Sequence, residues 1–311
     1  MKLVKKYSIA VAVLLVTSIN FAQEDSQEKS NVQEFTPSKL LSKGQWDIKF
    51  FNGLYTQTKR TDGGSKSVDI NRESFFTNTT EIYTGLSDNS RINIGLIFQV
   101  RANTYSGADA LDVFSFKDNE LDARSGFTTI APSIRVQPFK NVSNFSFTSS
   151  LFLPIFKDVP NAPYLDKRSI FWETKFFYDK TFGRGDWQVF TEADLGFNFG
   201  ESRQDADADE VNEGERFANN SLSVPVSVFL SYFPSTKSTV FVNTQQSFFI
   251  GYDNPGNDNN NFSQDYTALG FGGKYQLTNA LNLELSYNKF VRGHNFQGLG
   301  QTFSLGLRAI L

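Results

Sequence analysis

Apolar and polar residues alternate with a period of two along most of the chain, and helical periodicity does not recur. The clearest stretch runs from Arg91 to Asn103. Its even-numbered positions are all apolar and its odd-numbered positions are polar or glycine, except Ile97. A strand of about 10 residues tilted near 45° crosses the hydrocarbon core of a bilayer. The pattern therefore predicts membrane-crossing strands with one face toward lipid and the other toward water.

The same alternation predicts an all-β chain of about twelve strands. The predicted strands are 45–57, 72–86, 91–105, 127–138, 145–154, 169–181, 187–199, 221–233, 239–250, 265–277, 281–291 and 301–311.

Short and long connections alternate between these strands. The short, turn-rich ones are 87–90, 139–144, 183–186, 234–238 and 278–280, and the long ones are 58–71, 106–126, 155–168, 200–220, 251–264 and 292–300. An outer-membrane barrel with short periplasmic turns and long outer loops has this arrangement, whereas a soluble β-sandwich does not sort its loops. Lipid offers no hydrogen bonds, so the sheet must close. We expect a transmembrane antiparallel up-and-down β-barrel over residues 45–311.

The N-terminal residues predict a targeting segment rather than part of the fold. Lys2, Lys5 and Lys6 precede an apolar run at 9–16, and a cut after Ala22 makes 1–22 a secretory signal peptide. Residues 23–44 are polar and are expected in the periplasm. Within them 36–44 has a helix start, two leucines and a stop, which predicts a short helix plugging the barrel; a disordered tail is the alternative.

Composition narrows the class further. Hydrophobic residues are 39% and aromatics 15% of the chain, Phe alone contributes 33 residues, and the mean hydropathy is −0.34. High polarity with abundant Phe suits strands that average an apolar and a wet face. With no Cys and one His, no disulfide framework, thiolate site, metal centre or cofactor is expected. The formal net charge of −3 gives no reason to expect a nucleic-acid partner.

Three features carry a resemblance to a known group: the Phe21-Ala22-Gln23 cut, the Phe-rich alternating strands and the Asn/Asp-rich loops. The chain resembles outer-membrane β-barrel proteins of the Bacteroidetes type. Its strand count is also similar to that of the phenol-degradation-pathway family of outer-membrane transporters, although no diagnostic motif of that family is present. The resemblance implies a location in the outer membrane of a Gram-negative bacterium, with membrane lipid as the surrounding partner.

The positions opposite the lipid face form the predicted lumen, and they carry equal numbers of acids and bases. These are Asp47, Lys49, Glu81, Arg91, Arg101, Arg135, Glu173, Lys175, Asp179, Glu192, Asp194, Lys274, Glu284 and Arg308. Strands six and seven form an acidic arc, and strands twelve, one and three carry bases roughly opposite. Either the two sides set up a transverse field that selects dipolar solutes, or the charges pair across the lumen and brace it shut.

Local irregularities are also predicted within the strands. Pro132 and Pro225 cannot donate a hydrogen bond to the β-ladder, so each should kink its strand or open a local gap. Such a site is either a side opening that releases an apolar solute into the membrane or a bulge near the barrel rim. Phe50-Phe51 shifts the alternation and suggests a bulge. Glycines on the lumen face are expected to make room for a pore or for neighbouring rings; they are Gly85, Gly95, Gly196, Gly270, Gly272 and Gly306.

Catalytic and metal chemistry is disfavoured. The lone His294 lies in a loop without the His-x-Ser spacing of outer-membrane phospholipases, so the chain is not expected to be an enzyme. The acidic run 205–210 begins like a calcium loop but lacks its sixth-position Gly and twelfth-position Glu, so loop 200–220 is expected to be a solvated loop; loose Ca²⁺ bridging is the alternative.

These patterns lead to two competing functions. The first is a channel or facilitator that passes a small solute across the outer membrane, gated by the long loops or by the N-terminal segment. The second is a non-conducting barrel that docks a secretion or surface-assembly machine.

Overall fold

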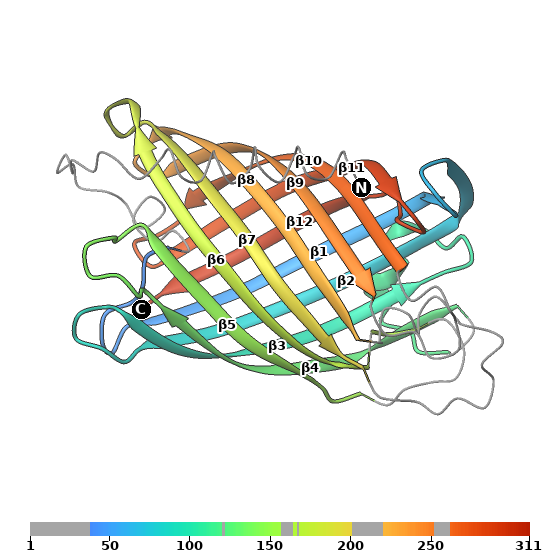
Figure 1. Ribbon diagram of the computed structural model, residues 1–311, viewed down its shortest axis with the longest axis horizontal. Helices are drawn as coiled ribbons and strands as arrows, with labels where there is room; N and C mark the ends of the chain where they lie inside the picture. The colour runs from blue at the N-terminus through green and yellow to red at the C-terminus, as the bar shows by residue number, and fades with distance from the viewer. Residues whose placement is uncertain (1–37, 120–121, 157–163, 167, 201–219, 252–261) are drawn as a thin grey trace.

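The computed structural model is a closed barrel of twelve antiparallel strands (Figure 1). It describes residues 38–119, 122–156, 164–166, 168–200, 220–251 and 262–311. The strands are β1 (Trp46–Thr61), β2 (Ser67–Gly85), β3 (Ile92–Thr104), β4 (Ala123–Val136), β5 (Phe145–Pro154), β6 (Ile170–Phe182), β7 (Trp187–Phe199), β8 (Ser221–Ser235), β9 (Ser238–Gly251), β10 (Phe262–Gln276), β11 (Leu281–His294) and β12 (Gln301–Ile310). The predicted all-β barrel is confirmed, with every predicted strand present.

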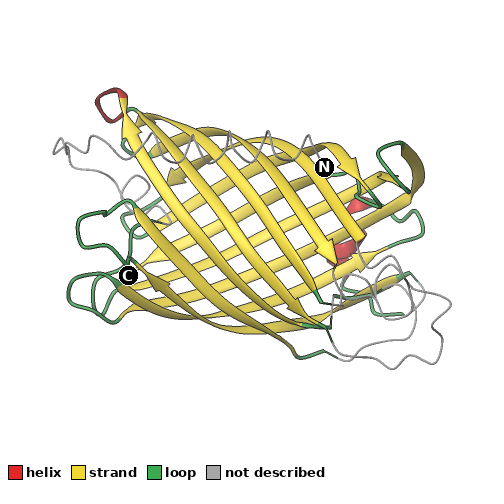
Figure 2. Cartoon of the chain, in the orientation of Figure 1, coloured by secondary structure: helices red, strands yellow, loops and turns green. Residues whose placement is uncertain are grey.

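Each strand pairs with its sequence neighbours, and the first pairs with the last. Asp47 on β1 lies opposite Ile310 on β12 and opposite Tyr83 on β2, so the sheet has no free edge. The strands cross the barrel obliquely, as Figure 2 shows. Closure lets every strand pair on both sides, which is what a sheet surrounded by hydrocarbon requires.

The alternation in sequence becomes an outside and an inside. Apolar side chains on one face of the strands are open to the surroundings; Val242 is 56% exposed, Phe271 60% and Leu285 54%. Their neighbours along each strand point into the barrel, where many polar side chains are buried, among them Asp47, Asn93 and Asp194. The outside is therefore the apolar surface, as in a membrane barrel and unlike a soluble protein.

The tight turns and the longer loops lie at opposite ends of the barrel. At the tight-turn end, the Ser87 hydroxyl accepts hydrogen bonds from the backbone N–H of Arg91 and Ile92 at 2.8 and 3.0 Å, which fixes the turn between β2 and β3. The one-turn helix η2 (Gly183–Gly185) also lies there. No helix in the described part of the chain is long and apolar enough to cross a membrane.

The predicted strict alternation of short and long connections is wrong at both ends of the chain. The loop between β1 and β2 spans only 62–66, and the loop between β11 and β12 only 295–300. Beyond the hydrocarbon a strand no longer needs an apolar face, so the ladder continues after the sequence alternation has ended. An isolated bridge between Arg60 and Gly298 ties the two hairpins together.

Of the irregularities predicted within the strands, the bulge at Phe50-Phe51 is wrong. Phe50 and Phe51 pair in register on both sides, and the bulge in β1 falls instead between Gln57 and Lys59. At both prolines the predicted gap in the ladder is present: the β4–β5 pairing skips Ala131 and Pro132, and the β7–β8 pairing skips Val224 and Pro225. The register is the same on both sides of each gap, so the alternative of a bulge is wrong. The missing proline N–H leaves a gap in the ladder without moving the strands.

The lumen glycines accommodate large neighbours. A Cβ on Gly95 would lie 2.3 Å from the Tyr83 ring, and one on Gly306 would lie 2.7 Å from the Phe51 ring. Gly196 and Gly272 face Phe171 and Phe241 in the same way. Each ring therefore lies against the backbone of a neighbouring strand. A side chain in place of the glycine would collide with the ring.

Candidate functional site

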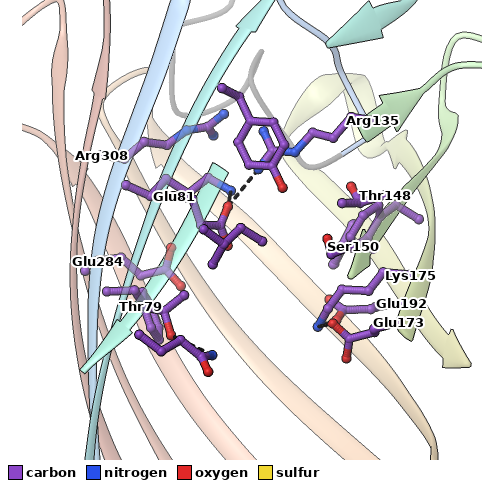
Figure 3. A pocket seen from close by; sticks show the side chains of 18 of the residues that line it. Thr79, Glu81, Arg135, Thr148, Ser150, Glu173, Lys175, Glu192, Glu284 and Arg308 are labelled. Atoms are coloured by element: carbon purple, nitrogen blue, oxygen red, sulfur yellow. Dashed lines mark hydrogen bonds and ion pairs between the residues drawn. The ribbon is translucent and has the colours of Figure 1, made fainter. Parts of the chain in front are cut away.

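A cavity of about 750 Å³ lies inside the barrel, lined by strands from the whole circumference. Its wall carries two separate groups of charged side chains that face each other (Figure 3). In the figure Arg308, Glu81 and Glu284 stand on one side, and Lys175, Glu192 and Glu173 on the other. The cavity is thus bounded by charge of both signs.

The first group, here called the basic cluster, consists of Asp47, Lys49, Glu81, Arg135 and Arg308. Arg308 Nε and Nη2 contact the Asp47 carboxylate at 2.8 and 2.9 Å, and Arg135 Nη1 contacts it at 3.0 Å. Glu81 receives Arg135 Nη2 at 2.7 Å and Lys49 Nζ at 3.2 Å. Cations outnumber carboxylates here, so the cluster retains positive charge although every member is paired.

Tyr83 holds the central arginine of the basic cluster in place. The Arg135 guanidinium carbon lies 3.3 Å from the centre of the Tyr83 ring, and the Tyr83 hydroxyl donates to Ser133 at 2.7 Å. The ring is 1% exposed and packs against Leu41 and Ile310. A cation over an aromatic face gains electrostatic attraction, and the packed ring fixes its direction.

The second group, the acidic cluster, consists of Glu173, Lys175, Glu192 and Asp194 on β6 and β7. Lys175 Nζ lies 3.5, 3.4 and 3.3 Å from the Glu173, Glu192 and Asp194 carboxylates respectively. One ammonium shared by three carboxylates leaves this cluster negative. A third, balanced pair, Lys274 with Glu284 at 3.0 Å, joins β10 and β11.

A row of phenylalanines lies beside the acidic cluster, one step closer to the tight turns. Phe177, Phe190, Phe229 and Phe241 come from four successive strands, with neighbouring ring centres 5.9, 5.6 and 5.7 Å apart. All four line the cavity. This aromatic row offers an apolar surface to a solute whose charged groups meet the two clusters.

Residues 164–166, in the connection between β5 and β6, lie against the inner wall at the long-loop end. Asp166 in this loop is paired with Arg101 on β3 at 2.9 Å, and Asn103 donates to the carbonyl oxygens of Tyr164 and Leu165 at 2.9 and 2.8 Å. Leu165 is 5% exposed, and Asp166 lines the cavity. The described residues 164–166 of this loop therefore lie inside the barrel opening.

The loop between β3 and β4 behaves in the opposite way. Its short helix η1 (Ala110–Ser115) buries Val113 against Phe76 and Ala102, which lie on the outer face of β2 and β3. This loop packs on the outside of the barrel wall, so it does not close the lumen.

The segment 38–45 occupies the tight-turn end. Asn93 binds the backbone of Leu41 twice, accepting from its N–H and donating to its C=O, both at 3.0 Å. Ser38 donates to Asp179, and Ser42 lies 2.8 Å from Ser90. The described part of the predicted plug helix, 38–44, is not helical but extended with a turn; these backbone contacts to Asn93 and the close approach to Gly85 replace helical hydrogen bonds.

The structure distributes the charged residues predicted for the lumen among these groups. The basic cluster, the acidic cluster, the Lys274–Glu284 pair and Arg101 contain most of them. Asp179 sits apart near the tight turns, where Gln188 donates to it at 3.3 Å. Arg91 lies in the turn before β3 and donates to the carbonyl oxygens of Gln137 and Pro138 at 3.0 and 2.5 Å, so it does not join the predicted basic side.

Sequence reasoning missed the lumen aromatics and the inward loop. Phe177 and Phe190 share the parity of the acidic residues on their strands, so the alternation could have placed them inside. Tyr83 was detectable in the same way. Asp166 was not, because nothing in a loop sequence shows which way the loop folds.

His294 contacts a serine that is far from it in the chain. Its Nδ1 lies 3.0 Å from the Ser65 hydroxyl, on the hairpin between β1 and β2. The acid opposite His294 in the register, Asp265, is paired with Arg292. The described residues hold no group of three or more His, Cys, Asp or Glu side chains placed to bind a metal. The predicted signal peptide and most of loop 200–220 lie outside the described residues.

The fold is similar to solved outer-membrane proteins. The COG4313 outer membrane channel from Pseudomonas putida F1 matches with a TM-score of 0.66 and 12% identity, covering 93% of this chain and all of the other (100%). The β domain of the Bordetella autotransporter BrkA matches with a TM-score of 0.50 and 11% identity over 85% of this chain and 98% of the other. No family model and no curated protein matches the sequence. This chain has the fold of Gram-negative outer-membrane β-barrels, in agreement with its predicted location.

Proposed function

We propose that this protein is an outer-membrane channel for small dipolar solutes. The observation that carries the proposal is the pair of oppositely charged clusters on facing walls of one cavity (Figure 3). A solute with an amine at one end and an acid at the other can meet the acidic cluster and the basic cluster at once.

The local pairing of the charges supports a field across the cavity rather than a brace. Lys49 pairs with Glu81 on the next strand, Arg308 with Asp47 on the next strand, and Lys175 only with β6 and β7. Arg135 reaches further, but its partners also belong to the basic cluster. Pairing within each wall leaves a net charge of opposite sign on the two sides.

The inward loop and the N-terminal segment support control of passage. Residues 38–45 are bound at the tight-turn end, and residues 164–166 are bound at the other. Both lie outside the β-ladder and are held largely by side-chain contacts, so both are candidates for gates. The non-conducting docking barrel is the alternative, favoured by the buried position of Leu41, which is 2% exposed.

Planar-bilayer recording of the refolded chain separates the two functions. We expect single-channel steps in wild type, and larger ones in a variant lacking residues 23–44. A barrel that stays silent in both forms would reject the channel and favour the docking role. The resemblance to Bacteroidetes-type barrels agrees with the outer-membrane location of the proposed channel, and the similarity in strand count to the phenol-degradation-pathway transporters agrees with its transport role.

A further inference from the structure

The acidic cluster has a composition that differs from that of an ordinary ion pair. Three carboxylates converge on one ammonium, at 3.5 Å (Glu173), 3.4 Å (Glu192) and 3.3 Å (Asp194). By contrast, the Lys274–Glu284 pair on the opposite side of the barrel joins one cation to one anion. The acidic cluster therefore has unused capacity for positive charge.

The burial of Asp194 makes a shortage of positive charge in this cluster unfavourable. The residue is 4% exposed, and one of its carboxylate oxygens, Oδ1, is buried without a hydrogen-bond partner. Its other oxygen, Oδ2, accepts from the Lys175 ammonium at 3.3 Å. Asp194 also lies at the ladder gap opposite Pro225. The β7–β8 pairs end at Ala193 on one side of the gap and begin again at Gly196 on the other. A buried carboxylate short of donors favours any additional cation that can reach it.

Lys175 has the freedom to give way. Its side chain is 35% exposed, and the side chains of Glu173 and Glu192 are 15% and 24% exposed. All three line the cavity. A lysine ammonium sits on a flexible four-carbon stem with three rotatable donors. It can leave the carboxylates for the cavity without disturbing the strands.

We propose that Glu173, Glu192 and Asp194 form a binding site for the protonated primary amine of a solute, and that the Lys175 ammonium is its resident stand-in. This rests on the proposed function for how the solute arrives. The entering amine takes the place of Lys175 among the carboxylates, while its carbon chain lies along Phe177 and Phe190. No bond is made or broken.

The ligand chemistry follows from the occupant already in place. Lys175 shows that an alkylammonium reaches three carboxylates within 3.3–3.5 Å. An ammonium has three donors, one for each carboxylate. A quaternary ammonium has none, and a divalent cation needs oxygen ligands at about 2.3–2.6 Å or less, with no cation among them.

Binding to the detergent-folded full chain tests the site without requiring conduction. n-Butylammonium chloride is titrated by calorimetry at constant ionic strength, with n-butanol, tetramethylammonium and Ca²⁺ as comparison probes. Wild type should bind butylammonium and none of the comparison probes. Lys175→Met should bind it about tenfold tighter if Lys175 fills the site about nine-tenths of the time. Glu192→Gln should bind it about tenfold more weakly, the loss of one charged hydrogen bond.

The control is Lys59→Met, which removes a lysine from an exposed pair with Asp69 outside the cavity and should leave binding unchanged. Folding of each variant is checked by its heat-dependent mobility on gels, with Lys175→Gln as a second variant. Equal heats for butylammonium and butanol in wild type and in both Lys175 variants would overturn the site, as would preferential Ca²⁺ binding. A barrel that binds the amine but never conducts overturns only the channel; one that conducts without binding overturns only this site.

Discussion

Arg101 on β3 holds Asp166 of the β5–β6 loop at 2.9 Å, and this contact ties a loop to the inner wall at the long-loop end. Both side chains are largely shielded, with 30% and 13% exposure. The amide of Asn103 is a second anchor, donating to the carbonyl oxygens of Tyr164 and Leu165. The described residues of this loop are therefore held to the inner wall by an ion pair and by an amide of β3.

Replacing Arg101 by Ala should widen the lumen opening at this end. Losing a partly shielded pair costs about 1 kcal/mol, which shifts the bound loop toward open positions by roughly fivefold. Single-channel recording should show larger or longer openings. Arg292→Ala is the matched control, because it breaks a pair with Asp265 at the same end but on the outer face. Unchanged openings in Arg101→Ala would mean that the loop does not limit passage.

Asn93→Ala should release the segment 38–45 from the tight-turn end. Asn93 makes two hydrogen bonds to the Leu41 backbone, together contributing about 2 kcal/mol. Trypsin should then cut after Lys39 or Lys43 faster than in wild type. Asn89→Ala, an exposed turn residue at the same end, should change nothing. If both variants resist trypsin as wild type does, other contacts hold the segment.

Gly95→Ala should destabilise the barrel by about 1–3 kcal/mol, because the new methyl group would lie 2.3 Å from the Tyr83 ring. Moving that ring also removes the surface on which Arg135 lies. Gly53→Ala is the control, since a Cβ there meets no atom within 4 Å. Urea unfolding in detergent measures both. Equal midpoints for the two variants would show that Tyr83 moves without cost.

Pro132→Ala should stabilise the barrel by about 0.5–1.5 kcal/mol, since it supplies the N–H that the β4–β5 ladder lacks. The register is already continuous across the gap, so no strand has to shift. Pro138→Ala, in the turn after β4, should have little effect. A lower unfolding midpoint for Pro132→Ala would show that the gap relieves strain, and the ladder argument would then be wrong.

The alternation along the chain was enough to predict the barrel because lipid imposes a rule on every second residue. Leu96 and Ile94 must face hydrocarbon, and their neighbours Gly95 and Asn93 are then forced inward. The same parity placed Glu173, Lys175, Glu192 and Asp194 on one wall. Beyond the lipid, alternate residues no longer have to be apolar. The alternation therefore could not predict that β1 extends to Thr61 and β11 to His294.

The contacts that shape the candidate site were beyond the sequence for another reason. They join residues far apart in the chain, such as Arg135 with Asp47 and Asn93 with Leu41. Parity shows that a side chain points inward but not how far it reaches across the barrel. Arg91 illustrates the limit, because its parity is correct but carbonyl oxygens of the neighbouring turn hold it.

Liposome swelling with two isomeric solutes tests the opposed clusters most directly. β-Alanine is dipolar and lactamide is its neutral isomer, so size does not separate them. Two water-exposed ion contacts of about 0.2–1 kcal/mol each favour β-alanine by a few-fold. We expect faster swelling with β-alanine in wild type, and a smaller difference in Glu173→Gln/Glu192→Gln. Equal rates for the two isomers in wild type would contradict the role assigned to the facing clusters.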